Sequence, residues 1–149
     1  MALDFDTTVK LDIYRTIAET TKAPGAEEVA ASLGASREEV LAAFERLHAR
    51  RLLVPEPGDP ARIRMAPPFS GVPTPFLVKV GRKGYFANCV WDALGVAAAL
   101  HADAVVKASD GATGEPMSIV VEGGRPLPAP SVAHFAVPAA RWWEDIVYT

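Results

Sequence analysis

The sequence predicts an α+β fold, with an N-terminal winged helix-turn-helix followed by a small mixed or antiparallel β-sheet domain that contains a buried helix. Three observations lead to this prediction. Segments with helix-capping signals fill the first fifty residues, and short β-branched runs separated by Gly and Pro turns fill much of the rest. Between those runs, residues 90–100 are rich in Ala and Leu and longer than a typical strand, which predicts a helix that is apolar on all sides.

The composition is that of an ordinary globular chain with one domain or two small ones. Half of the 149 residues are apolar, and the net charge of −3 disfavours general attraction to nucleic acid or to a membrane. A single cysteine excludes an internal disulfide and fits a reducing compartment. The first residues lack the basic and apolar regions of a signal peptide. We therefore expect a cytoplasmic location and no membrane partner.

Three helices are expected in the N-terminal third. The first is expected to begin at Thr7 or Thr8 as the N-cap and to run to about residue 21. The second covers residues 26–33. The third opens at Ser36, where Glu39 lies three residues later and completes a capping box.

A pair of strands, at residues 52–54 and 61–65, would complete a winged helix by forming its wing. Winged helices often bind DNA, but residues 1–66 carry nine Lys and Arg against eleven Asp and Glu. The third helix also starts with two carboxylates where contacts to bases and phosphates would be needed. DNA is therefore a disfavoured partner, although a winged-helix transcriptional regulator stays open as an alternative.

Closely spaced prolines mark residues 67–77 as a stiff, extended linker between a domain at 1–66 and a second domain at 78–149. The second domain is expected to contain a helix that starts near residue 88 and a short helix after Pro138. Its expected strands, one of which begins in the linker, cover residues 76–80, 104–108, 117–121, 131–137 and 146–148.

The apolar helix carries the two residues of greatest chemical interest. With Asn88 as its N-cap, Cys89 occupies the first helical position and Asp92 lies three residues on, on the same face. The helix start favours a thiolate at Cys89, whereas burial and the neighbouring carboxylate oppose it. Burial also raises the pKa of Asp92, which would keep a proton available for donation. The alternative is that Cys89 is a small core residue and Asp92 a first-turn helix charge.

The chain resembles the organomercurial (alkylmercury) lyases through motifs that occur in the order found in that family. These are PFSGVPTP at residues 68–75, GR at 81–82, CVWDALG at 89–95 and ATGEP at 112–116. The resemblance implies that Cys89 binds mercury, and that Asp92 takes part in cleaving the carbon–mercury bond by delivering a proton to the leaving carbon. It also implies a winged helix at the N-terminus that serves as packing or as a cover for the site.

The chain departs from the family pattern at two places. The family's second, downstream cysteine is absent, and Asn88 stands where the family tends to have an aromatic residue. Residues 142–149 resemble the approach to that second cysteine. Two interpretations stay open: a chain that continues past Thr149 to include the second cysteine, or a divergent member with half of the thiol pair.

The predicted function is therefore that of an impaired or truncated organomercurial lyase. It would use no resident cofactor, would need an external thiol, and would take an organomercurial as its small-molecule substrate. An alternative on the same fold is a non-catalytic protein that binds or senses a thiophilic metal or a small ligand.

Overall fold

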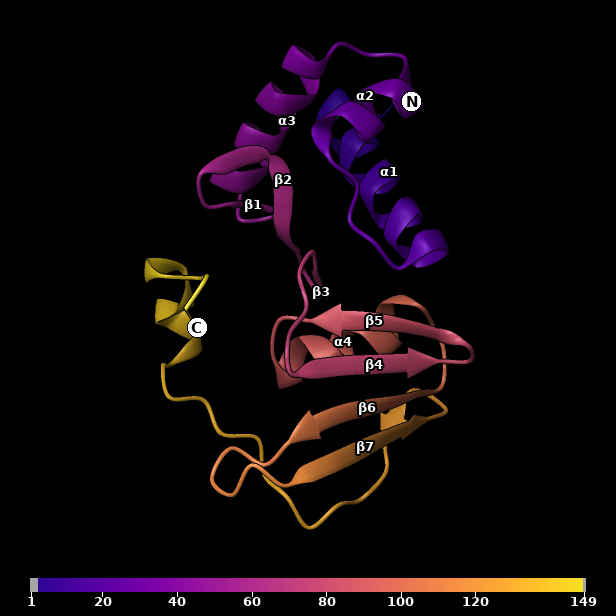
Figure 1. Ribbon diagram of the computed structural model, residues 1–149, viewed down its shortest axis with the longest axis vertical. Helices are drawn as coiled ribbons and strands as arrows, with labels where there is room; N and C mark the ends of the chain where they lie inside the picture. Colours follow the sequence, from indigo (N-terminus) through magenta and orange to yellow (C-terminus); the bar gives the residue numbers. More distant parts are fainter. Residues whose placement is uncertain (1–2, 149) are drawn as a thin grey trace.

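The computed structural model describes residues 3–148 as a helical unit at one end of an antiparallel sheet, with a C-terminal segment that returns toward the helical unit (Figure 1). Among the described residues, no helix is long and apolar enough to cross a membrane. The helical unit contains α1 (Phe5–Thr20), α2 (Ala26–Leu33) and α3 (Arg37–Ala49).

The caps of these helices explain where each one begins. The predicted cap of α1 at Thr7 or Thr8 is wrong, because the Asp4 side chain caps the helix by accepting from the Thr7 backbone N–H at 3.0 Å. The predicted capping box of α3 is confirmed. Ser36 Oγ accepts from the Glu39 backbone N–H at 3.2 Å, and Glu39 accepts from the Ser36 backbone N–H at 2.9 Å. The α2 range agrees with the prediction.

A β-hairpin follows α3 and consists of β1 (Val54–Glu56) and β2 (Asp59–Ala66). The second strand includes the predicted residues. The first starts two residues later than predicted, and Leu53 is buried ahead of it. The apolar side chains before β1 thus pack on the helices, and the strand starts only after this contact.

The sheet has eight strands in the order β1-β2-β3-β5-β4-β6-β7-β8, and every neighbouring pair within residues 3–148 is antiparallel. The α+β class is confirmed, and of the two sheet types predicted the structure has the antiparallel one. The remaining strands are β3 (Phe69–Ser70), β4 (Phe76–Val80), β5 (Lys83–Ala87), β6 (Ala104–Ser109), β7 (Pro116–Glu122) and β8 (Arg125–Pro126). The two-residue β3 joins the hairpin to the rest of the sheet, so the segment predicted as a linker is itself part of the sheet.

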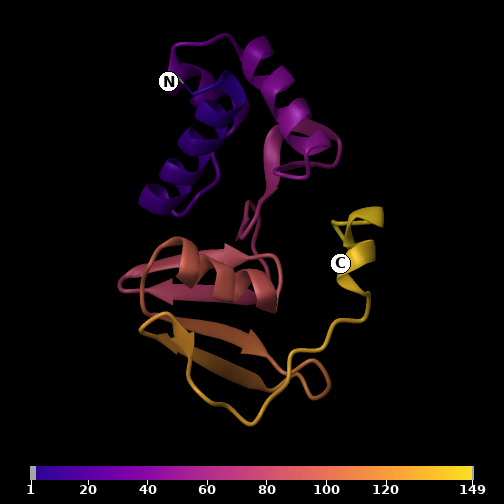
Figure 2. The ribbon, with the colours of Figure 1, turned by 180° about the vertical axis from the view of Figure 1, so that it is seen from behind.

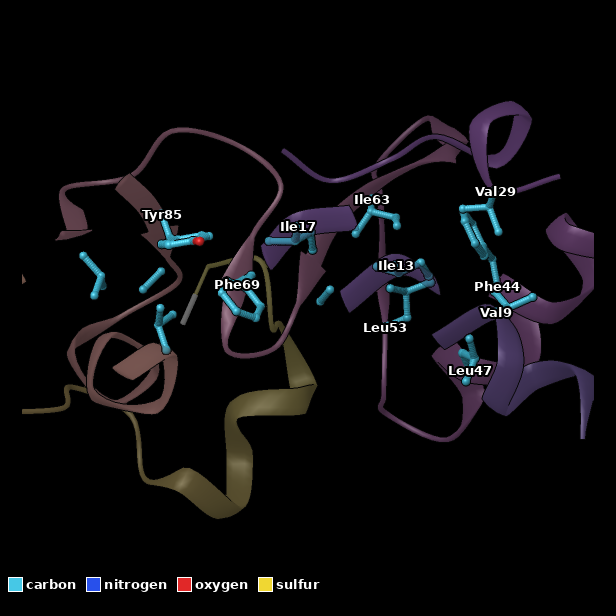
Figure 3. Packing of buried hydrophobic residues seen from close by; sticks show 14 of the residues in the cluster. Val9, Ile13, Ile17, Val29, Phe44, Leu47, Leu53, Ile63, Phe69 and Tyr85 are labelled. Carbon is cyan, nitrogen blue, oxygen red and sulfur yellow. The ribbon is translucent and has the colours of Figure 1, made fainter. Parts of the chain in front are cut away.

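One continuous cluster of buried apolar side chains extends from the helical unit into the sheet (Figure 3). Phe44 lies among the helices, Ile63 on the hairpin, and Phe69 and Tyr85 at the start of the larger part of the sheet. The helical unit and the sheet therefore share a core through β2 and β3.

The helix α4 (Val90–Ala99) lies against β4 and β5. The prediction that this helix is buried on all sides is wrong for one side. Ala93, Val96 and Ala97 are buried, whereas Trp91 is 65% exposed. The apolar sequence of α4 exceeds what one sheet face can cover, so part of its surface stays open.

The C-terminal segment departs most from the prediction. The strands predicted at residues 131–137 and 146–148 are wrong, since the first range is irregular and the second forms a turn, while Thr149 lies outside the described residues. Pro128 and Pro130 cannot donate to a neighbouring strand, and no residue between 122 and 148 is buried. The short helix after Pro138 is confirmed as the 3-10 helix η1 (Ala139–Glu144), which lies on the side of the molecule where the hairpin is (Figure 2).

Candidate functional site

The structure places Cys89 at the N-cap of α4, so the helix begins at Val90, one residue later than predicted. The Cys89 backbone is extended, with φ −154° and ψ −176°, and the Ala93 backbone N–H donates to its carbonyl at 2.9 Å. The predicted cap at Asn88 is therefore wrong, because the N-cap position is occupied by Cys89, whose side chain makes no capping hydrogen bond.

The Asn88 side chain instead contacts Asp92, one turn into the helix. Asn88 Nδ2 donates to Asp92 Oδ2 at 2.8 Å and to the Phe69 carbonyl oxygen at 3.3 Å. The other amide atom, Asn88 Oδ1, is buried and has no protein partner within the described residues. Asn88 thus links β3 to the first turn of α4.

The electrostatics of the two groups follow from partial burial. Burial raises the pKa of the Cys89 thiol, the Asp92 carboxylate adds to this rise, and the dipoles of the Asp92 and Trp91 backbone N–H groups lower the pKa in part. Burial also raises the pKa of the Asp92 carboxyl, and the Asn88 hydrogen bond opposes that rise in part. Both pKa shifts increase the populations of the neutral thiol and the neutral carboxyl relative to the same groups in water.

Tyr14, on α1, is a neighbour of the site that the sequence does not reveal. Its hydroxyl donates to the Pro67 carbonyl oxygen at 2.6 Å, and its ring packs edge-on against Phe69 with 6.1 Å between centroids. Burial and the nearby negative charge of Asp92 raise the pKa of Tyr14 to about 12. The first contact spans 53 positions of the chain, and no local pattern encodes a contact of that range.

The proline-rich connector packs directly on α4. A Cβ atom at Gly95 would lie 3.0 Å from the Pro68 Cβ, so a side chain at this position would push the connector away from the helix. Gly95 therefore allows the close approach that holds the connector beside the first two turns of α4. Sequence reasoning noted both residues as family motifs without predicting their contact.

The chemistry available here is that of one soft ligand beside one acid. Residues 3–148 contain no group of three or more His, Cys, Asp and Glu side chains that could hold a metal ion together. Cys89 is the only thiol in the chain and is partly exposed. A thiol suits a soft metal such as mercury, and a carboxyl with a raised pKa one turn away has the chemistry needed to donate a proton.

Taken together, the fold and site define an α+β protein whose thiol and acid lie at the start of a helix packed on an antiparallel sheet. The family model for alkylmercury lyase (MerB) matches residues 69–149, which is more than half of the chain, and the chain belongs to this family. A search of curated proteins gives no match.

Among solved structures, the chain is similar to the one described as the crystal structure of the mercury-bound form of MerB2. The TM-score is 0.67 and the sequences are 23% identical. The match covers 85% of this chain and 60% of the other. It supports the fold, and the chain spans about 60% of the length of that relative.

Proposed function

We propose that this chain is an organomercurial lyase that cleaves a carbon–mercury bond by protonolysis. Cys89 binds the mercury and Asp92 delivers the proton. The observation that carries the proposal is the joint placement of the two groups at the start of α4, with Cys89 at the N-cap and Asp92 in the first turn. Membership of the alkylmercury lyase family supports the choice of substrate.

The proposed reaction uses the thiol and the carboxyl in turn. On binding an organomercurial cation, the Cys89 thiol loses its proton to solvent and forms a sulfur–mercury bond, so the raised thiol pKa is overcome by metal binding. Asp92 is protonated more readily than an exposed aspartate and can act as the acid. Its proton adds to the carbon, the carbon–mercury electron pair forms the new C–H bond, and the hydrocarbon leaves. Mercury(II) stays on sulfur, and the Asp92 carboxylate regains a proton from solvent.

An external thiol is part of this proposal, because Cys89 is the only cysteine in the sequence. Thiolates are preferred ligands for soft metals, and a second one from solution would stabilise the departing mercury and remove it from Cys89. A reducing cytoplasm would supply such thiols. Turnover should therefore depend on thiol concentration, with no resident cofactor.

The N-terminal unit is proposed to be a winged helix-turn-helix domain, residues 1–66, that covers the site on the 78–149 domain through the 67–77 connector. Tyr14 supports this role by its bond to Pro67. Tyr85 Oη and Lys83 Nζ each donate to the Ala18 carbonyl oxygen at 2.8 Å and fasten the end of α1 to β5. Such contacts would keep water and bulky solutes away from Asp92.

A role in DNA binding is not favoured by the charges of this unit. Arg46 is paired with Asp6 at 2.6 Å and Arg64 with Glu56 at 3.5 Å. Two of the cations that could have formed a phosphate-binding cluster are thus neutralised within the fold. Retention of duplex DNA at low salt would support the regulator alternative instead.

A second candidate is a binding protein or sensor that takes up a thiophilic metal or an apolar ligand without releasing a product. A groove beside the open side of α4 favours it. Its lining includes Trp91 and Leu94 on the helix and Val121 and Pro126 on the sheet. An apolar molecule could bury surface there without any chemistry at Asp92.

The decisive experiment measures hydrocarbon release from phenylmercury or methylmercury with excess free thiol. We expect benzene or methane from the wild-type chain and none from Cys89→Ser, which should also lose mercury binding. Asp92→Asn should still bind mercury but release no hydrocarbon. Binding without release by the wild-type chain would favour the sensor, and release that survives Cys89→Ser would rule out the lyase mechanism.

A further inference from the structure

The orientation of the Asn88 amide is fixed by what surrounds it. Nδ2 has two hydrogens, and two acceptors take them, Asp92 Oδ2 at 2.8 Å and the Phe69 carbonyl oxygen at 3.3 Å. Turning the amide over would place Oδ1 against the carbonyl oxygen and the carboxylate. The side chain is thus held as a double donor between β3 and α4.

The other end of the amide argues against a purely structural role. Asn88 Oδ1 is buried and has no protein partner within residues 3–148, and burying an acceptor in this way costs free energy. The N-cap role that would justify an asparagine before a helix belongs to Cys89. The cost of burying Oδ1 is offset by the two N–H donors that the same amide supplies to Asp92 and to Phe69.

We propose that Asn88 is a positioning residue that determines which oxygen of Asp92 carries the transferable proton. This inference rests on the proposed lyase function. Because Asn88 donates to Oδ2, that oxygen is an acceptor and the proton of the neutral carboxyl lies on Oδ1. During cleavage the proton moves from Oδ1 to the carbon of the substrate, and the negative charge left on Asp92 is stabilised by the same Asn88 N–H. Solvent then returns a proton to Oδ1.

The chain offers an unusually direct way to observe this contact. Asn88 is the only asparagine in the sequence, and there is no glutamine, so the protein has a single side-chain carboxamide. A ¹⁵N–¹H correlation spectrum of the full chain should therefore contain one NH₂ pair. We expect its two protons to be well separated in shift and slow to exchange. In Asp92→Ala, the proton that faced Oδ2 should move toward the shift of a free amide.

The catalytic part is tested with Asn88→Leu, which is similar in size and has no donor. With methylmercury and excess thiol, we expect kcat to fall by about tenfold to a hundredfold while KM and the mercury adduct on Cys89 stay unchanged. The matched control is Thr74→Val. It removes a hydrogen bond of 2.5 Å to the Ala87 carbonyl oxygen in the same region and leaves Asp92 untouched. Its kcat per folded molecule should equal that of the wild type.

Each outcome decides the matter. The positioning role would be overturned if the Asn88 NH₂ protons had the chemical shifts of a free carboxamide and these shifts did not change in Asp92→Ala. This holds whatever the activity. Full turnover by Asn88→Leu, or an equal loss of turnover in Thr74→Val, would also overturn it. If the wild-type chain releases no hydrocarbon, the lyase function fails and the catalytic role of Asn88 fails with it. The amide spectrum then separates that failure from a misplaced side chain.

Discussion

The helical unit and the C-terminal segment, residues 127–148, both contain many apolar residues, but they are held in different ways. In the helices, Val9, Ile13, Val40 and Phe44 are no more than 1% exposed and lie in the shared core. In the C-terminal segment no residue is buried, and Val132 is 91% exposed. Apolar composition alone therefore does not lead to burial. A capped helix presents its apolar residues on one face, whereas a proline-interrupted segment does not.

The comparison is tested most strongly by removing one large side chain from each region. Phe44→Ala should lower the free energy of unfolding by about 3–5 kcal/mol, because it leaves a cavity in a packed core. Val132→Ala should change it by less than about 0.5 kcal/mol, since the side chain is already in water. Urea denaturation followed by far-UV circular dichroism measures both. Equal losses would mean that the C-terminal segment is packed on a surface after all.

Much of the fold could be predicted because the signals are local. The Ser36 and Glu39 capping box fixes the start of α3, and the alternating run at residues 76–80 gives β4. The predictions of secondary structure fail where the structure depends on contacts between residues far apart in the sequence. An apolar run at residues 131–137 looks like a strand but is irregular, because pairing also requires a neighbouring strand, which no local pattern specifies.

The candidate site also combines features that local sequence predicts with features that depend on distant parts of the chain. Cys89 and Asp92 could be selected from spacing along one helix and from the family resemblance, which carried most of the weight. The contact of Asn88 with Asp92 is also local, but an asparagine before a helix suggests a cap, and only the extended backbone at Cys89 rules that out. Tyr14 was missed because its role depends on the return of the chain at Pro67.

Tyr14 links the helical unit to the site. Its titration should change the free energy of unfolding by less than Phe44→Ala and by more than a surface contact. Its pKa rises from 10.0 to about 12 in the folded state, so between these values the unfolded chain loses a proton that the folded chain keeps. Folding stability should then fall as pH rises from 10 toward 12, and be fully present below 10. Allowing for partial exposure, the fall should be about 1–2 kcal/mol. Urea midpoints at several pH values measure it.

The matched variant is Tyr14→Phe, which keeps the ring and removes the titrating group. Its stability should lack this alkaline loss when compared with the wild type, while other groups, such as Tyr85, cancel in the difference. Tyr148→Phe is the control for the loss of a tyrosine hydroxyl at an exposed position, since Tyr148 is 80% exposed. If Tyr14→Phe followed the wild-type profile, the hydroxyl would be in water and the contact with Pro67 would not persist in solution.

The smallest loss among the residues that make contacts is expected where η1 packs on the helical unit. The Trp143 ring lies 6.4 Å from the His48 ring and 5.8 Å from the Arg51 guanidinium, and a cation–π contact at a surface contributes about 0.5–1 kcal/mol. Trp143→Ala should therefore lower the free energy of unfolding by less than about 1 kcal/mol. It should still increase proteolytic cleavage of residues 127–138, because this contact holds the far end of that segment. Leu127→Ala, at the opposite end of the segment from this contact, is the control and should leave cleavage unchanged. A loss as large as that of Phe44→Ala would make the C-terminal segment part of the cooperative core and remove the contrast between the two regions.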